Sequence, residues 1–138
     1  MGALSDRSLG HRGLLLLSFV GAATAANGLV VFAPRNADCV GVFDAASDAF
    51  SCVDISSTLS IDSKFYGATT AANGLVIFAP YYADAVGVFD TATNTFDATT
   101  STGALTTDSK FAGAATLGTK VVFAPYNANK VGVFAIDP

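Results

Sequence analysis

Residues 65–110 read FYGATTAANGLVIFAPYYADAVGVFDTATNTFDATTSTGALTTDSK. Residues 19–64 carry the same pattern, with about 26 of the 46 positions identical, and a third copy from Phe111 to Pro138 covers half of it. Self-similarity at a period of this length is the signature of a repeat architecture. We therefore divide the chain into a divergent N-terminal segment (1–18), repeat 1 (19–64), repeat 2 (65–110) and an incomplete repeat 3 (111–138).

Each full repeat splits into four short strands. In repeat 2 we predict them at Phe65–Thr69, Leu75–Ala79, Ala85–Asp90 and Thr95–Thr99, because these runs are rich in Val, Phe, Ile and Thr and are bounded by Gly, Pro, Asn and Asp. Asn73-Gly74 suits a two-residue hairpin turn, since both of its central residues need a positive φ. No stretch shows a 3.6-residue apolar period, so the chain is predicted to be all-β.

Four antiparallel strands in about 45 residues describe one blade of a β-propeller. The second and third strands are apolar on both faces, which suits blades that are stacked on both sides. Gly41, Gly87 and Gly132 are expected where a neighbouring sheet or backbone comes close. An antiparallel sandwich built from duplicated hairpins, or another β-solenoid, is the alternative.

Closed propellers need about four to eight blades, and two full repeats with half of a third are too few. We therefore predict a partial propeller of antiparallel four-stranded blades, either open or completed by oligomerisation, or part of a longer protein. Residues 2–8 resemble the repeat tail at 103–109, so they are a candidate remnant of a fourth strand. An open stack would expose apolar blade faces, and such patches mark association surfaces.

The stretch ADAVGVFDTATNTF at residues 83–96 resembles the YVTN-type β-propeller repeat, whose hairpin reads D-x-V-x-V-I-D-x-x-T-N-x-V. Phe89 stands where that family usually has Ile, and Phe-Ala-Pro replaces the Tyr-Val-Thr-Asn strand. The repeats also look like the FAP…VGVFD repeats of marine microalgal proteins. The resemblance runs from Phe19 to the end of the chain. It implies a fold and the stacking of repeats, and it implies no catalytic residues.

The N-terminal 25 residues imitate a secretory signal peptide, with Arg7, His11 and Arg12, a short apolar run at Leu14–Leu17, and Ala23-Thr24-Ala25. The repeat argues against cleavage there, because residues 19–27 match 65–73 and so form the first strand of a blade. We expect no membrane span, since the chain lacks a run of eighteen apolar residues.

Composition excludes several function classes. Apolar residues make up 51% of the chain and charged residues 13%, the opposite of a disordered chain. A net charge of -4 with seven scattered basic residues gives no support for nucleic-acid binding.

The two cysteines, Cys39 and Cys52, correspond to Ala85 and Ala98 in repeat 2, which suggests small core residues. If Asp44 pairs with Ala49, the two cysteines lie diagonally across two strands. Diagonal neighbours are about 7–8 Å apart, so we expect no disulfide.

No catalytic or metal-binding set is apparent. His11 is the only histidine and lies outside the repeats, and no G-x-S-x-G motif, phosphate-binding loop or calcium-loop spacing occurs. The Asp residues recur at matching turns, as turn-capping residues do. We therefore predict no enzyme, no cofactor and no metal.

One edge of the blades carries the polar and aromatic side chains. The loop between the second and third strands and the connection to the next blade should share one rim, and Tyr and Arg on loops above a rigid frame suit recognition. The alternative is that tyrosines shield a blade edge while Asp and Lys pair across it. The candidate binding residues are Arg35, Asn36, Tyr81, Tyr82, Tyr126, Asn127, Lys64 and Lys110.

These observations favour a non-enzymatic repeat module that binds a protein partner or itself through its apolar blade faces. The alternative function is a glycan- or small-ligand-binding lectin-like propeller completed by oligomerisation. A third is an enzyme whose site is completed by further blades.

Overall fold

The computed structural model describes residues 2–4 and 18–136, which form strands joined by turns and contain no helix. The first two strand groups have four members each and the last has three. The strands are β1 (Phe19–Thr24), β2 (Leu29–Pro34), β3 (Cys39–Asp44), β4 (Ala49–Asp54), β5 (Phe65–Thr70), β6 (Val76–Pro80), β7 (Gly87–Asp90), β8 (Thr95–Asp97), β9 (Phe111–Leu117), β10 (Lys120–Pro125) and β11 (Gly132–Ala135).

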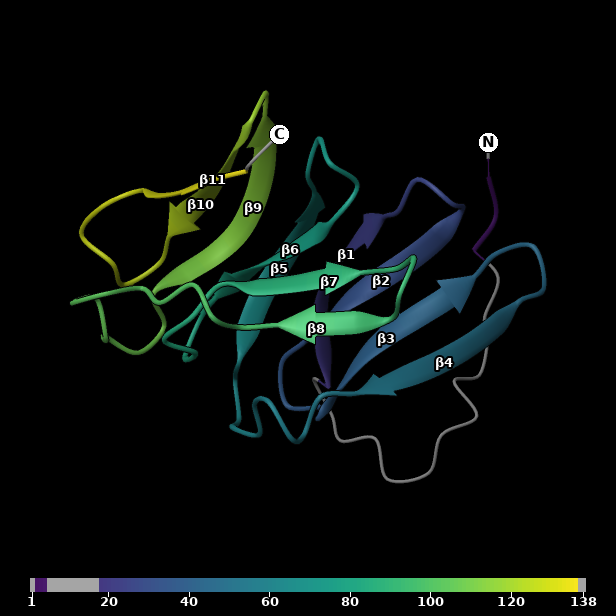
Figure 1. The fold of residues 1–138 in the computed structure, drawn as a ribbon, viewed down its shortest axis with the longest axis horizontal. Coiled ribbons are helices and arrows are strands. Elements are labelled where there is room, and N and C mark those ends of the chain that lie inside the picture. The colour runs from purple at the N-terminus through teal and green to yellow at the C-terminus, as the bar shows by residue number, and fades with distance from the viewer. Residues whose placement is uncertain (1, 5–17, 137–138) are drawn as a thin grey trace.

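Each group is one antiparallel sheet in which neighbouring strands follow the chain order. We call them blade 1 (β1–β4), blade 2 (β5–β8) and blade 3 (β9–β11). Figure 1 shows the three blades following one another across the molecule, and β5 lies against β1 on one side and β9 on the other. The predicted all-β class with antiparallel four-stranded blades is confirmed. Strand ends in blade 2 differ by at most two residues from those predicted: β7 begins at Gly87 instead of Ala85, and β8 ends at Asp97 instead of Thr99.

The innermost strands approach one another at a set of glycines that the sequence did not single out for this role. Gly21, Gly67 and Gly113 all have positive φ, at 92°, 109° and 101°. A Cβ on Gly21 would lie 2.6 Å from the Gly67 Cα, and a Cβ on Gly67 would lie 2.7 Å from the Gly113 Cα. β1 and β5 can therefore contact their neighbours backbone to backbone only because these positions lack a side chain.

The prediction that Gly41, Gly87 and Gly132 mark the approach of a neighbouring sheet is wrong. A Cβ on Gly87 would meet the rings of Phe65 and Phe78, at 2.7 and 2.9 Å, and both belong to the same blade. These glycines make room for phenylalanine side chains that lie across the blade's own surface.

Every blade has two different faces. The phenylalanines lie on one face, which in blade 2 holds Phe65, Phe78, Phe89 and Phe96, whereas the opposite face is lined by small aliphatic side chains. The phenylalanine face of blade 2 packs on the aliphatic face of blade 1, which includes Val31, Ala33, Val40 and Val42. Blade 3 packs on blade 2 in the same sense. The core therefore consists of two junctions of the same kind, in each of which the phenylalanine face of one blade packs on the aliphatic face of the blade before it.

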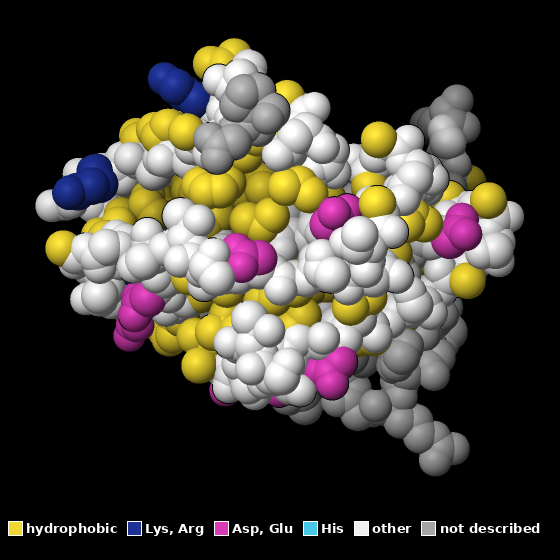
Figure 2. Space-filling model, viewed as in Figure 1, with side chains coloured by type: hydrophobic (Ala, Val, Ile, Leu, Met, Phe, Trp, Pro, Cys, Tyr) yellow, Lys and Arg dark blue, Asp and Glu magenta, His cyan; other side chains and the backbone are white. Residues whose placement is uncertain are grey.

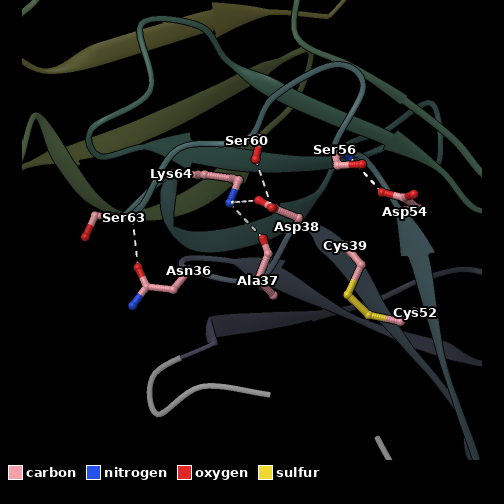
Figure 3. Close-up of polar contacts among 10 residues, drawn as sticks. All are labelled: Asn36, Ala37, Asp38, Cys39, Cys52, Asp54, Ser56, Ser60, Ser63 and Lys64. Carbon is pink, nitrogen blue, oxygen red and sulfur yellow. Dashed lines mark hydrogen bonds and ion pairs between the residues drawn. A yellow bond between two sulfur atoms is a disulfide. The ribbon is translucent and has the colours of Figure 1, made fainter. Parts of the chain in front are cut away.

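The expectation of unpaired cysteines is corrected, because Cys39 and Cys52 form a disulfide (Figure 3). Asp44 does pair with Ala49, so the cysteines are diagonal neighbours as assumed, but their Cα atoms are only 5.4 Å apart. The right-handed twist of neighbouring strands shortens one of the two diagonals, which the flat-sheet distance ignored.

Removing this disulfide should lower the free energy of unfolding by about 2–3 kcal/mol, because it closes a short loop of the unfolded chain. The measurement is urea unfolding of the protein with and without reducing agent. The double variant Cys39→Ala/Cys52→Ala, which copies blade 2, is the control: it should be insensitive to the reducing agent. An equal stability of reduced and oxidised protein would contradict the prediction.

Only part of the N-terminal segment lies within the described residues. Residues 2–4 lie outside any strand and Leu4 is exposed, while the rest of the candidate remnant strand and Leu14–Leu17 fall outside the described residues. Ala23 and Thr24 belong to β1 and Ala25 is buried, so this stretch is the first strand of a blade, as predicted.

Candidate functional site

Tyrosine rings from repeats 2 and 3 meet on one rim of the molecule. Tyr81 is at the centre, with ring centroids 5.2 Å from Tyr66, 5.4 Å from Tyr82 and 5.7 Å from Tyr126. Tyr81 is buried, whereas Tyr82 and Tyr126 are 40% and 62% exposed. We call these four residues with Arg35 the rim cluster. In this cluster the exposed rings of Tyr82 and Tyr126 pack on the buried ring of Tyr81.

Arg35 joins the cluster from the loop between β2 and β3. Its guanidinium carbon lies 5.8 Å from the ring centroids of both Tyr66 and Tyr81, within the range of cation–π attraction. Its Nε is buried and has no hydrogen-bond partner. A buried donor without a partner is uncommon in folded proteins and requires an explanation.

The two lysines among the candidate binding residues are part of the frame. Lys64 and Lys110 are fully buried, and their Nζ atoms lie 2.8 and 2.7 Å from carboxylate oxygens of Asp38 and Asp84. Lys64 also donates to the Ala37 carbonyl, as Figure 3 shows. Each lysine therefore fastens the start of one blade to the loop of the blade before it, as the alternative interpretation of the rim proposed.

The remaining polar candidates separate into two places. The side-chain oxygen of Asn36 accepts a hydrogen bond from the Ser63 amide at 2.9 Å, so Asn36 also joins the frame (Figure 3). Asn127 is exposed and lines a cavity between blades 2 and 3. The structure thus brings Arg35, Tyr81, Tyr82 and Tyr126 together, and Tyr66, which lies in β5 and not in a loop, completes the group.

The cavity measures about 580 Å³ and was not predicted. Blade 3 contributes Phe111, Phe123, Gly132 and Phe134 to its wall, and the connection after β8 contributes the opposite side. Figure 2 shows hydrophobic side chains gathered around a hollow on this side of the molecule. The incomplete third repeat was the signal in the sequence that could have indicated it.

The pKa of Asp38 is lowered, first by the hydrogen bond from Lys64 and then by that from Ser60. A lowered pKa in the folded state stabilises the fold above the ordinary value of 3.8, and this contribution is lost as the pH falls through the folded-state pKa. We expect the Asp38→Asn variant to lose less stability than the unaltered protein between pH 6 and pH 3. Urea unfolding at each pH is the measurement. Asp54, whose pKa the Ser56 amide lowers, contributes equally in both proteins and so produces no difference between them. Parallel losses of stability in the two proteins would therefore contradict the prediction for Asp38.

Within residues 2–4 and 18–136, no group of three or more His, Cys, Asp or Glu side chains is placed to hold a metal ion. In the same part of the chain, no helix has the length and hydrophobicity needed to cross a membrane.

Comparison with solved structures bears directly on the fold. The chain superposes on a catalytically inactive virginiamycin B lyase from Staphylococcus aureus with quinupristin, with a TM-score of 0.75 and 15% identity. The match covers 96% of this chain and 42% of that one. The fold is a β-propeller.

Two further structures agree. The selenomethionine-substituted virginiamycin B lyase from S. aureus matches with a TM-score of 0.75, 14% identity, and 97% and 42% of the two chains. A streptogramin B lyase matches with a TM-score of 0.66, 13% identity, and 99% and 46% coverage. This propeller chain thus spans less than half the length of each, and at such identity the likeness concerns the fold alone. No protein-family profile matches the sequence, and no curated protein matches it.

Proposed function

We propose that this chain is a non-enzymatic propeller module, built from YVTN-type repeats, whose role is protein interaction and above all association with copies of itself. The observation that carries the proposal is the asymmetry of the blades. Inside the chain a phenylalanine face always packs on an aliphatic face. Of the two outer faces, that of blade 1 is a phenylalanine face and that of blade 3 is an aliphatic face.

The aliphatic face of blade 3 is the exposed counterpart of faces that are buried elsewhere. Val131 and Val133 are 56% and 59% exposed, whereas Val40 and Val42 at the same positions of blade 1 are 0% and 6% exposed. At the opposite end, the phenylalanine face of blade 1, with Phe19, Phe32 and Phe50, is only partly buried. A second copy could therefore add its blade 1 to blade 3 with the packing already used twice within the chain.

The polar residues at the two outer blades are also compatible with a junction between copies. At each internal junction a buried lysine that precedes the new blade pairs with an aspartate of the previous blade. The residue at the lysine position before blade 1 is Ser18, and the residue at the aspartate position of blade 3 is Asn129. Because both charged partners are replaced by neutral ones, these two positions would bring no unpaired charge into a junction between blade 3 and another copy's blade 1.

A closed dimer of this kind would contain six blades, within the range of known propellers. We expect light scattering to give a discrete oligomer, and we expect Val133→Asp to convert it to monomer, because a carboxylate would be buried in the junction. Ala92→Asp, on the exposed β7–β8 turn of the middle blade, is the control and should leave the mass unchanged. A monomer at high concentration, or an oligomer that survives Val133→Asp, would overturn the proposal.

The rim cluster favours a second candidate function, binding of a glycan or another small ligand. Tyr82 and Tyr126 offer exposed rings for stacking. Both contact the ring of Tyr81, whose centroid lies 5.8 Å from the Arg35 guanidinium carbon. The test is a glycan array followed by titration of any hit against Tyr126→Ala. An empty array, or binding that Tyr126→Ala leaves unchanged, would end this candidate.

A further inference from the structure

We propose that the rim cluster binds an acidic oligosaccharide, whose carboxylate pairs with Arg35 while one of its sugar rings packs on Tyr82. The proposal rests on the glycan-binding candidate above and names the class of glycan. It does not depend on the outer faces of blades 1 and 3, because the residues that carry it, Arg35, Tyr66, Tyr81 and Tyr82, belong to blades 1 and 2 and meet where these blades join.

The rim cluster collects residues in which one blade departs from the other two. Where repeat 1 has Arg35, the other repeats have tyrosine. Where repeat 2 has Tyr66 and Tyr82, the other repeats have an aliphatic residue and asparagine, respectively. All three contact the ring of Tyr81, at 5.8, 5.2 and 5.4 Å from its centroid. Positions shared by all blades build the common fold, so departures that meet at one place indicate a task that the other blades do not share.

Arg35 is the cation of this rim that has no anionic partner. The two buried lysines each pair with an aspartate, at 2.8 and 2.7 Å, whereas within the described part of the chain no carboxylate pairs with Arg35. Its Nε is buried and has no hydrogen-bond partner, which is costly for a charged donor. Arg35 as a whole is only partly buried, so a ligand can contact it without separating the blades. The side chain therefore favours an anion that the chain itself does not supply.

The tyrosine rings determine which anion fits. The guanidinium carbon lies 5.8 Å from the ring centroids of both Tyr66 and Tyr81, so the side chain is held in one place by aromatic contacts. A guanidinium packed on rings keeps its planar donors free for two parallel hydrogen bonds, the arrangement that carboxylates accept. Turning toward such a carboxylate would also give Nε the acceptor that it lacks.

Tyr82 supplies the surface for the rest of the ligand. It is 40% exposed although a blade packs on each side of its own, and it stacks on Tyr81 with an angle of 22° between the rings. A flat ring that is fixed from behind offers an apolar face with little entropy to lose, and the C–H face of a sugar can pack on it. Because Tyr82 and Arg35 both contact Tyr81, a short oligosaccharide can reach both. One apolar ring face and one carboxylate are the features of a uronic acid.

The chain can report this binding by its own fluorescence, since it contains no tryptophan and its four tyrosines are all members of the rim cluster. The experiment titrates the full chain with a trisaccharide of glucuronic acid and with the methyl ester of the same trisaccharide, which lacks only the charge. We expect a saturable change with the acid and an affinity at least about tenfold weaker with the ester, as for loss of a charge-assisted pair. The affinity for the acid should fall as salt is added.

Arg35→Gln tests the location. We expect this variant to bind the acid no more tightly than the ester, and to bind the ester as the unaltered protein does. Arg35→Lys keeps the charge but not the paired hydrogen bonds and should fall between the two. Lys120→Gln is the matched control, because it removes the same charge from an exposed residue at the start of β10, whereas the rim follows the end of that strand. It should leave binding unchanged. Tyr82→Ala should weaken the acid and the ester alike.

Equal affinity for the acid and the ester would overturn the proposal and leave glycan binding itself standing. The same conclusion would follow if Arg35→Gln bound the acid normally, or if Lys120→Gln lost as much affinity as Arg35→Gln. Equally tight binding of acetate or of a triglutamate peptide would also overturn it, by assigning the site to a carboxylate without a sugar. The ester comparison needs no substitution, so it decides the matter even if Arg35→Gln unfolds. Light scattering on the same samples reports self-association separately.

Discussion

Gly67→Ala is expected to lower the free energy of unfolding by about 4 kcal/mol, enough to unfold a marginally stable domain. The added Cβ would lie 2.7 Å from the Gly113 Cα, a contact with backbone that no side-chain rotation can relieve. The residue also has a φ of +109°, which strains any side chain. Blades 2 and 3 would have to move apart where their innermost strands meet. Urea unfolding followed by circular dichroism is the measurement.

Gly74→Ala is the matched control for this substitution. Gly74 also has a positive φ, +86°, but a Cβ there meets no atom within 4 Å. Its replacement should therefore cost only the backbone strain, about 1 kcal/mol. Equal losses for the two variants would show that the approach of the innermost strands contributes nothing to stability.

Phe65→Ala is expected to cost about 3–5 kcal/mol, because the ring is fully buried between blades 1 and 2 and its loss leaves a cavity. Phe19 occupies the same position in blade 1 but is only partly buried. Phe19→Ala should therefore cost about 1–2 kcal/mol in a monomer. Thermal and urea unfolding at several protein concentrations are the measurements.

The pair of phenylalanine variants also bears on association. If a second copy covers the outer face of blade 1, the loss caused by Phe19→Ala should grow with protein concentration and approach that of Phe65→Ala. A loss that stays the same at all concentrations would argue against that contact. Similar losses for both variants in dilute monomer would contradict the assignment of blade 1 as an outer blade.

The fold could be predicted from sequence because two full copies of the repeat made its period and strand boundaries visible. The faces of the blades were harder to predict, since Gly41 and Gly67 look alike in a sequence. One makes room for rings of its own blade and the other for a neighbouring backbone, and only three-dimensional packing separates them. The disulfide was missed because the Cys39–Cys52 distance depends on strand twist, which no local pattern records.

The rim could be predicted in part for the same reason. Loop positions after Pro34, Pro80 and Pro125 indicated where Arg35, Tyr81 and Tyr126 would gather. Burial then separated exposed tyrosines from Lys64 and Lys110, whose long side chains reach back to the preceding blade. The cavity lies where blades 1 and 2 have a fourth strand and where the described residues of blade 3 have none. It becomes visible only when the three blades are compared in space.

The unlike faces of each blade have a consequence for growth of the assembly. A contact between unlike surfaces has a direction, so copies would join in one polarity only, and two identical ends would not pair. The number of copies in a closed ring would then be set by the angle between successive blades and not by the strength of the contact. Gain or loss of one whole repeat would preserve both ends, so such a chain could change its size without any change at its junctions.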